Sequence, residues 1–208
     1  MEQKPEVVTD GLSNVGAVQT GTLEALAMAL DYRDQSTSGH SRRVANLTVN
    51  VARAYGVDGH ALQQVEQGAL LHDIGKLKIP DSILWKPSQL DDAEWVTMRR
   101  HPEYGYEMLR SLEFYDEAAE LVLSHHEKFD GSGYPRGLRG DLIPLGARIF
   151  SVVDAVDAMI YKRPYNEPIT FKEAAEEVRR CAGTQFDPDL IPLTIEVLEE
   201  CVPKNLRG

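Results

Sequence analysis

Apolar residues recur three and four positions apart along most of this 208-residue chain, and this spacing restricts it to helical folds. Two early segments carry the pattern most clearly, with Leu23, Leu26, Ala27 and Leu30 in the first and Val44, Leu47, Val51 and Ala54 in the second. A third apolar stripe covers residues 149–160. The alternation of apolar and polar residues that half-buried strands show is missing from the sequence. The sequence therefore predicts an all-α bundle.

Proline and capping residues predict where some of these helices begin and end. Residues 91–112 are predicted to form a helix interrupted at His101–Pro102, because proline disfavours helical geometry in the residue before it. Thr170 and Glu173 have the spacing of a capping box, which predicts a helix start. Asp187–Pro188 places a cap and a proline in the preferred order, which predicts the start of a last helix.

Length and composition indicate one globular domain. Hydrophobic residues make up 42% of the chain and charged residues 26%, which is ordinary for a domain with a sizeable core. Residues 1–19 show little periodicity, and we predict a tail or linker there and a single domain over residues 20–208. The sequence contains no run of 18 apolar residues, so we expect no membrane span.

The net charge indicates which kinds of ligand the protein can bind, and the cysteine content indicates its cellular compartment. The net charge of −11 argues against binding to polymeric nucleic acid, which requires a basic surface. It leaves room for a small anionic ligand whose charge is offset by metal ions. Cys181 and Cys201 fit no metal-ligand spacing, and the N-terminus lacks the apolar core of a signal peptide. A reduced, cytoplasmic setting is the resulting expectation.

Five of the six histidines fall at predicted helix ends, where side chains from several helices can converge. They are His40, His72, His101, His125 and His126, whereas His60 is expected on the surface. Consecutive helical residues point about 100° apart, so His72 and its neighbour Asp73 can face one site only where the helix frays. A two-metal centre relaxes this constraint further, because one carboxylate can bridge both ions. Asp73 is the candidate bridge.

Further candidates for the same site lie on other segments. Asp154 and Asp157 are nearly one turn apart on an otherwise apolar helix, where two carboxylates need partners. Imidazoles and carboxylates without cysteine suit iron, manganese, nickel or zinc better than calcium or magnesium. Lys76 lies three residues after Asp73, and a helical turn would place it on the same side. Asp157 is a candidate for orienting Lys76 or a metal-bound water.

His40, the His72–Asp73 pair and the distant Asp154 resemble the HD phosphohydrolase superfamily. Three longer motifs resemble the HD-GYP domain more specifically, and they are HDIGKLKIP at 72–80, HHEKFDGSGYP at 125–135 and DAVDAM…RPY at 154–165. The resemblance covers roughly residues 23–192. HD-GYP domains are all-helical bacterial cyclic di-GMP phosphodiesterases with two or three metal ions. The resemblance implies a single helical bundle with a glycine-rich GYP loop.

The resemblance also implies roles for individual residues. One metal would be held by His40, His72, Asp73 and Asp154, and a second by Asp73, His101, His125 and His126. Lys76 would contact the scissile phosphate, Tyr134 would line the substrate pocket, and Arg163 would touch the ligand. Two divalent transition-metal ions are expected, with iron or manganese first and nickel or zinc as the other options.

Two positions depart from the pattern of some family members. Ser36 stands where a glutamate helps to hold a third metal, and Asn166 stands where a lysine reaches the substrate. Asp34 is two residues from Ser36, but helical geometry would point its carboxylate elsewhere. We therefore predict a dinuclear centre, because a third dication adds repulsion that a neutral hydroxyl does not offset.

The function that the resemblance implies is hydrolysis of cyclic di-GMP by a metal-bridging hydroxide, giving linear pGpG, with GMP as an alternative product. Two alternatives stay open. One is a phosphodiesterase for another cyclic dinucleotide, such as cyclic GMP-AMP. The other is a weakly catalytic module that binds nucleotide or docks a diguanylate cyclase domain through the GYP loop. The complete ligand set and Lys76 favour an enzyme, and a dimer is one option for its oligomeric state.

Overall fold

The computed structural model describes residues 9–34, 39–162 and 167–207, without the side chains of residues 9–19. Within these ranges all regular structure is helical, apart from a single bridge between Ala182 and Phe186, so the all-α prediction is confirmed. The α-helices are α1 (Thr9–Asp34), α2 (His40–Ala54), α3 (Gly59–Leu70), α4 (Asp81–Leu84), α5 (Asp92–Met98), α6 (His101–Arg110), α7 (Asp116–Ser124), α8 (Leu145–Ile160), α9 (Phe171–Arg180) and α10 (Ile191–Cys201). Short 3-10 helices are η1 (Ile74–Lys78), η2 (Gly140–Leu142) and η3 (Lys204–Leu206).

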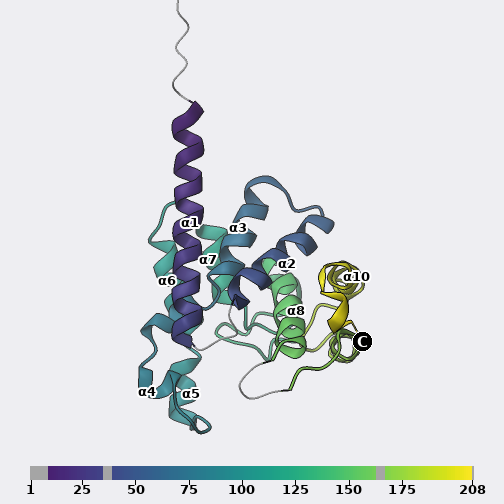
Figure 1. The fold of residues 1–208 in the computed structure, drawn as a ribbon. Helices are drawn as coiled ribbons and strands as arrows, with labels where there is room; N and C mark the ends of the chain where they lie inside the picture. The colour runs from purple at the N-terminus through teal and green to yellow at the C-terminus, as the bar shows by residue number, and fades with distance from the viewer. Residues whose placement is uncertain (1–8, 35–38, 163–166, 208) are drawn as a thin grey trace, which may run out of the picture.

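Helices α2 and α8 pack against each other at the centre of the bundle (Figure 1). Helices α3 and α7 continue the bundle on one side, and α9 and α10 complete it on the other. Helix α1 contacts α2, α3 and η1 near its C-terminal end, while its N-terminal part extends beyond the rest of the bundle. The ends of α2, α3, α6 and α7 therefore meet beside α8, which is where the sequence predicts a site.

Helix α8 supplies the centre of the core. The predicted apolar stripe is almost fully buried, with at most 1% exposure for Ile149, Val152, Val153, Val156 and Ile160. Burying apolar surface at this density is the main stabilising contribution to such a bundle. Phe150 is also completely buried, and its ring centroid lies 4.8 Å from that of His72. The core therefore extends directly beneath the candidate site.

Two predicted helix boundaries are confirmed. Helix α5 ends at Met98 and α6 begins at His101, with Pro102 in its first turn, where the missing N–H breaks no helical hydrogen bond. Thr170 caps α9 through a complete capping box, in which its hydroxyl accepts from the Glu173 N–H.

Two other boundaries differ from the prediction. The last α-helix begins at Ile191 and not at Asp187–Pro188. The buried Asp187 carboxylate instead accepts hydrogen bonds from Arg148 Nη1 at 2.6 Å and from the Asp189 N–H at 3.0 Å, so it stabilises a turn and a tertiary contact. The segment expected as tail or linker is helical from Thr9 onward.

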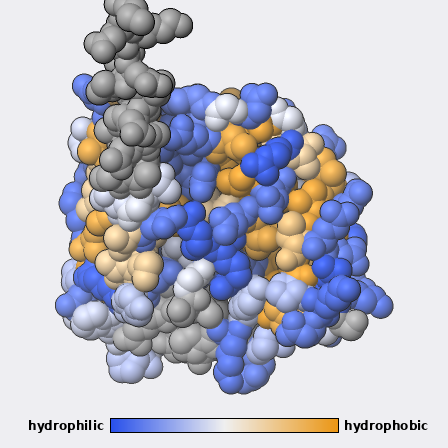
Figure 2. Space-filling view, turned by 45° about the horizontal axis from the view of Figure 1, so that its top comes forward, coloured by the Kyte–Doolittle hydropathy of each residue, from blue (hydrophilic) through white to orange (hydrophobic). Residues whose placement is uncertain are grey.

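The face of the molecule drawn in Figure 2 carries apolar side chains in several areas. On this face, these areas are separated by polar residues. Single exposed apolar residues, such as Phe114 and Leu142, are ordinary on a protein surface. Among the described helices, none combines the length and the apolar character needed to cross a bilayer.

The position of Phe150 generates a prediction about stability. Phe150→Ala should lower the free energy of unfolding by about 3–5 kcal/mol, because it opens a cavity in a fully packed core. Urea unfolding of the metal-free protein measures this value. The control Leu142→Ala removes a side chain that is 74% exposed, and its effect should stay within about 0.5 kcal/mol. Equal losses in the two variants would contradict the assignment of Phe150 to the core.

Candidate metal centre

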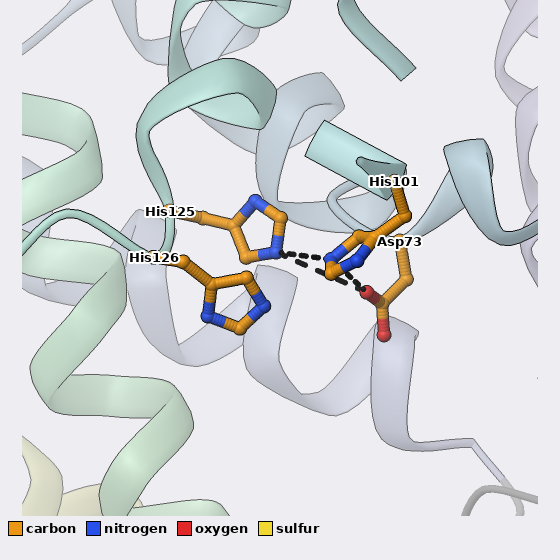
Figure 3. Close-up of side chains that lie close together, drawn as sticks. All are labelled: Asp73, His101, His125 and His126. Atoms are coloured by element: carbon orange, nitrogen blue, oxygen red, sulfur yellow. Dashed lines mark hydrogen bonds and ion pairs between the residues drawn. The ribbon is translucent and has the colours of Figure 1, made fainter. Parts of the chain in front are cut away.

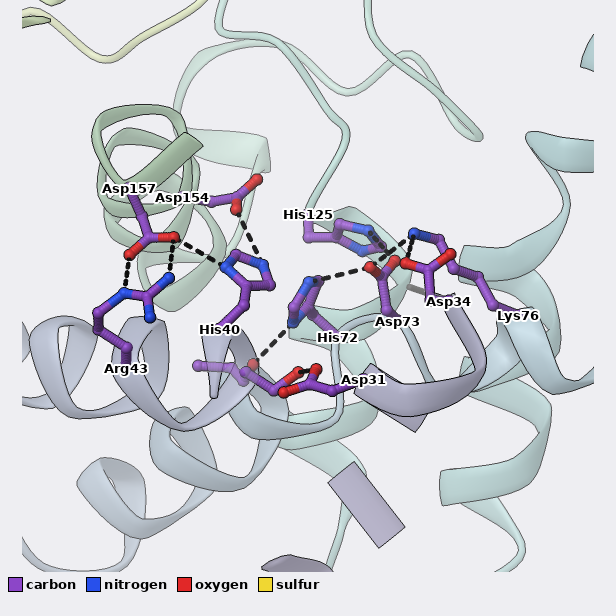
Figure 4. Close-up of polar contacts among 12 residues, drawn as sticks. Asp31, Asp34, His40, Arg43, His72, Asp73, Lys76, His125, Asp154 and Asp157 are labelled. Atoms are coloured by element: carbon purple, nitrogen blue, oxygen red, sulfur yellow. Dashed lines mark hydrogen bonds and ion pairs between the residues drawn. The ribbon is translucent and has the colours of Figure 1, made fainter. Parts of the chain in front are cut away.

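Three potential metal ligands form a first group, which consists of His40, His72 and Asp154. One ligand atom from each lies within 4.8 Å of the others, and His40 Nε2 is 3.5 Å from Asp154 Oδ1 (Figure 4). His40 begins α2, His72 lies in the turn after α3, and Asp154 projects from α8. Two helices and one turn therefore contribute to one potential metal site.

Four more potential ligands form a second group, which consists of Asp73, His101, His125 and His126 (Figure 3). Their ligand atoms also lie within 4.8 Å of one another. His101 is the first residue of α6, while His125 and His126 directly follow α7. All five histidines predicted to lie at helix ends do so, and the exposed His60 belongs to neither group.

The carboxylate of Asp73 faces both groups. Its Oδ2 atom lies 3.2 Å from Nε2 of His72, in the first group. Its Oδ1 atom lies 3.3 Å from Nε2 of His101 and 3.9 Å from Nε2 of His125, in the second group. Because Asp73 lies in the turn after α3, the geometry of a continuous helix does not restrict it or the adjacent His72. One carboxylate thus has an oxygen on each side of the centre.

The histidine rings are fixed through their Nδ1 atoms. Three of them pair with the backbone carbonyl three residues earlier, and these pairs are His72 with Ala69 at 2.9 Å, His101 with Met98 at 2.8 Å and His125 with Val122 at 2.6 Å. A carbonyl oxygen can only accept, so the neutral rings carry their proton on Nδ1 and a lone pair on Nε2. Metal-binding histidines are typically oriented in this way.

In the second group, the Nε2 atoms of neighbouring rings face each other without a proton to share, and a cation between them would remove this repulsion. His101 Nε2 and His125 Nε2 are 3.2 Å apart, although the Nδ1 contacts leave a lone pair on each. Burial, together with the neighbouring His126 and His101, holds the pKa of His125 well below its usual value. Burial and then His101 lower the pKa of His126 to about 3. Neutral imidazoles with converging lone pairs are the ligands that a divalent transition metal binds.

Lys76 is held at the edge of the centre by two carboxylates. Its Nζ atom lies 2.8 Å from Asp73 Oδ2 and 2.8 Å from Asp34 Oδ2 (Figure 4). Burial disfavours the charge on Lys76, but Asp73 and Asp34 outweigh this effect and raise its pKa. Burial likewise opposes ionisation of Asp73, while Lys76 and His72 together lower its pKa well below the usual range. At the end of α1 the Asp34 side chain turns toward Lys76, whereas Ser36, the third-metal position from which it is expected to point away, lies outside the described residues.

Asp157 contacts His40 and Arg43 and not Lys76. Its side chain is 1% exposed, its Oδ2 atom is 2.8 Å from His40 Nδ1, and both of its oxygens accept from the Arg43 guanidinium. Burial raises the pKa of Asp157, but the hydrogen bonds from His40 and Arg43 outweigh it and lower the pKa. Asp157 therefore orients the His40 ring, and its contacts differ from the expected interaction with Lys76. Sequence reasoning missed Arg43, although its position three residues after His40 places it on the same helical face.

Tyr134 lies against the second group. Its ring stacks on that of His126 with centroids 4.7 Å apart, and the Arg99 guanidinium lies 5.4 Å from the Tyr134 centroid. Burial and then the charge of Asp73 raise the pKa of Tyr134 to about 12, so the phenol stays protonated. The predicted site residue Arg163, and the departures Ser36 and Asn166, lie outside the described residues.

Glu127 is a structural residue of this region that sequence reasoning missed. It is 4% exposed, and its carboxylate accepts the N–H groups of Arg136 at 2.8 Å and Leu138 at 3.0 Å. These two bonds hold the loop that carries Tyr134 against the second group. The available signal was the position of Glu127, a carboxylate between His126 and a glycine-rich loop whose N–H groups have no helical partners.

Gly75 allows η1 to approach α6 closely. A Cβ atom added at Gly75 would lie 1.9 Å from the His101 carbonyl oxygen and 2.5 Å from the Gly105 nitrogen. No side chain fits that space without displacing backbone. The contact sets the distance between Asp73, at the start of η1, and His101, at the start of α6.

This contact generates a prediction about Gly75→Ala. The variant should lose metal from the second group and lose about 1–3 kcal/mol or more of unfolding free energy, because α6 must shift away from η1. Metal analysis after dialysis and urea unfolding measure the two effects. The matched control is Gly21→Ala on α1, where an added Cβ meets nothing within 4 Å and a helical alanine is favoured. Normal metal content in Gly75→Ala would contradict the importance of this contact.

Comparisons with known proteins agree with this fold and site. A profile of the HD domain matches residues 24–190. The cyclic di-GMP phosphodiesterase response regulator RpfG of Xanthomonas campestris is 41% identical over 189 residues, which are 90% of this chain and 47% of that protein. The 3'3'-cGAMP-specific phosphodiesterase 2 of Vibrio cholerae is 40% identical over 179 residues, which are 85% of this chain and 34% of that protein. The chain thus spans about a third to a half of the length of these relatives.

Solved structures share the fold at low sequence identity. The crystal structure of a cyclic GMP-AMP-specific phosphodiesterase of V. cholerae, V-cGAP3, has a TM-score of 0.68 at 19% identity, over 89% of this chain and 51% of that chain. The HD domain of the phosphodiesterase PgpH of Listeria monocytogenes, in complex with cyclic-di-AMP, has a TM-score of 0.60 at 21% identity, over 85% of this chain and 94% of that chain. The profile match, these relatives and the order of its motifs show that the chain belongs to the HD domain family, in its HD-GYP branch.

Proposed function

We propose that this chain is a metal-dependent phosphodiesterase that hydrolyses cyclic di-GMP to linear pGpG, with GMP as a further candidate product. One observation carries the proposal most directly. Two groups of buried and half-buried ligands share the carboxylate of Asp73, and the charged Lys76 lies 2.8 Å from that carboxylate. The names of the relatives above support cyclic dinucleotides as the substrate class.

We assign two divalent transition-metal ions to the centre, with iron or manganese first and nickel or zinc as the other options. The first would be held by His40, His72, Asp73 and Asp154, and the second by Asp73, His101, His125 and His126. When bound, such ions lower the pKa of a water molecule and offset charge on phosphoryl oxygens. The protein contributes Nε2 lone pairs in fixed positions. It also contributes a buried apolar surface beneath His72, which is the ring of Phe150.

Other residues of the chain would bind and orient the substrate. Lys76 would donate hydrogen bonds to a non-bridging phosphoryl oxygen, countering the negative charge that concentrates there in phosphoryl transfer. Tyr134, half-buried beside His126, would stack on part of the nucleotide. Arg163 keeps its proposed contact with the ligand on the strength of the RPY motif alone.

Cyclic GMP-AMP is a second candidate substrate. The relative named for cyclic GMP-AMP is 40% identical to this chain, and the relative named for cyclic di-GMP is 41% identical. These values do not separate the two substrates. Both share the phosphodiester that Lys76 would contact, so a choice between them depends on the bases.

Turnover decides between an enzyme and a binding module. Anaerobically purified protein, loaded with iron or manganese, should convert cyclic di-GMP to pGpG, and chromatography identifies the products. Parallel reactions with cyclic GMP-AMP measure base preference. The control His72→Ala/Asp73→Ala should show no turnover. A metal-loaded protein that binds but does not cleave either dinucleotide would support the docking module instead.

The shared carboxylate generates a prediction about Asp73→Asn. The variant should lose metal from both sites and lose activity, because an amide carries no charge to offset two ions. Metal analysis gives the number of ions per chain. Removal of the exposed imidazole in His60→Ala should leave this number unchanged. Retention of two ions and near-normal turnover by Asp73→Asn would show that Asp73 is not the bridge.

The position of Lys76 generates a second prediction. Lys76→Ala should keep both ions but lose about 100- to 1000-fold in kcat, as expected when a donor to the developing charge is removed. Lys78→Ala is the matched control, since Lys78 lies on the same 3-10 helix and pairs with the exposed Glu107. A loss of metal in Lys76→Ala that matches the loss of activity would mean that Lys76 supports the centre structurally.

A further inference from the structure

The last residue of α1 reaches the proposed catalytic lysine directly. Asp34 Oδ2 accepts from Lys76 Nζ at 2.8 Å, and the two side chains are 17% and 18% exposed. Residues 34 and 76 are distant in the sequence, so this ion pair is a tertiary contact between α1 and η1. Lys76 bonds to one other carboxylate among the described residues, which is the shared ligand Asp73.

The preceding residue, Arg33, fixes the backbone around the same lysine. Its Nη1 atom donates to the Lys76 carbonyl oxygen at 2.5 Å, and its Nη2 atom donates to the Ile79 carbonyl oxygen at 2.9 Å. Nη2 also pairs with Asp81 Oδ1 at 2.7 Å. The indole N–H of Trp85 donates to the Arg33 carbonyl oxygen at 2.6 Å, so the segment after η1 also bonds back to the end of α1. The final turn of α1 therefore fixes both the backbone and the ammonium group of Lys76.

The two carboxylates beside Lys76 are not equivalent. Asp73 faces the histidine Nε2 atoms on both sides, and cations placed among them would compete with the ammonium for its charge. In the described part of the chain, Asp34 forms no hydrogen bond or ion pair with a member of either ligand group. Its charge stays available to Lys76 when the charge of Asp73 is shared with metal ions.

We propose that Asp34 is a positioning residue for Lys76, which holds the ammonium at the edge of the centre while Arg33 fixes the η1 backbone. The inference rests on the proposed function, because it concerns the group that would contact the phosphate. It gives Asp34 a role different from that of a ligand for a third metal. It also makes α1 part of the catalytic apparatus, although α1 supplies no metal ligand.

The test compares Asp34→Asn and Lys76→Ala, singly and together. Asp34→Asn should keep its metal and lose roughly 10- to 100-fold in kcat, the range typical of residues that orient a functional group. The double variant should be no slower than Lys76→Ala, because Asp34 acts through the lysine. Glu107→Gln is the matched control, since it removes the carboxylate partner of Lys78 on the same η1 helix, and it should keep full activity.

A second measurement does not depend on catalysis. A double-variant cycle in urea, on metal-free protein, should show that Asp34→Asn costs less stability in the Lys76→Ala background than in the wild type. Wild-type protein without turnover, but with this coupling, would overturn the proposed function and leave the pairing of Asp34 with Lys76 intact. Wild-type turnover that Asp34→Asn leaves unchanged, or losses that add fully in the double variant, would overturn the positioning role. Loss of metal in Asp34→Asn would also overturn it, and would show that Asp34 supports the ligands instead.

Discussion

The carboxylate of Asp73, whose side chain is 15% exposed, is the group on which the rest of the centre depends. An ionised carboxylate in a protein interior is costly unless opposite charge and hydrogen-bond donors surround it. Lys76 at 2.8 Å from Oδ2 supplies the charge, and cations held by the histidines on both sides would supply more. Because its two oxygens face different ligand groups, Asp73 also sets how those groups lie relative to each other.

The helical bundle forms the two ligand groups around Asp73 by bringing helix ends together. Histidines at the ends of α2, α3, α6 and α7 meet beside α8. Carbonyls or Asp157 fix the Nδ1 atoms of four of them, which are His40, His72, His101 and His125. Close packing sets the spacing, since Gly75 leaves no room for a side chain between η1 and α6. Helix α1 holds the lysine from outside the ligand set. This helix has 26 residues and is about 39 Å long. Because Asp34 and Arg33 in its last turn contact Lys76, a displacement of the helix would change these contacts.

Much of this site follows from the sequence, because helix ends and motif spacing are local properties. The all-α fold, the break before α6 and the convergence of five histidines needed no tertiary information. The partners of Asp157 and Asp34 could not be predicted, because periodicity identifies a helical face but not the side chain that meets it. The start of α10 was misplaced for the same reason, since the contact of Asp187 with Arg148 is long-range.

Anomalous diffraction from crystals of the metal-loaded protein tests the central claim most directly. We predict two ions about 3.5–4 Å apart, as in two-metal hydrolytic sites, each bound to a different oxygen of Asp73. Lys76 Nζ should remain beside Asp34, without contact to either ion. A single ion, two ions that do not share Asp73, or a third ion bound to Asp34 would contradict the arrangement described above.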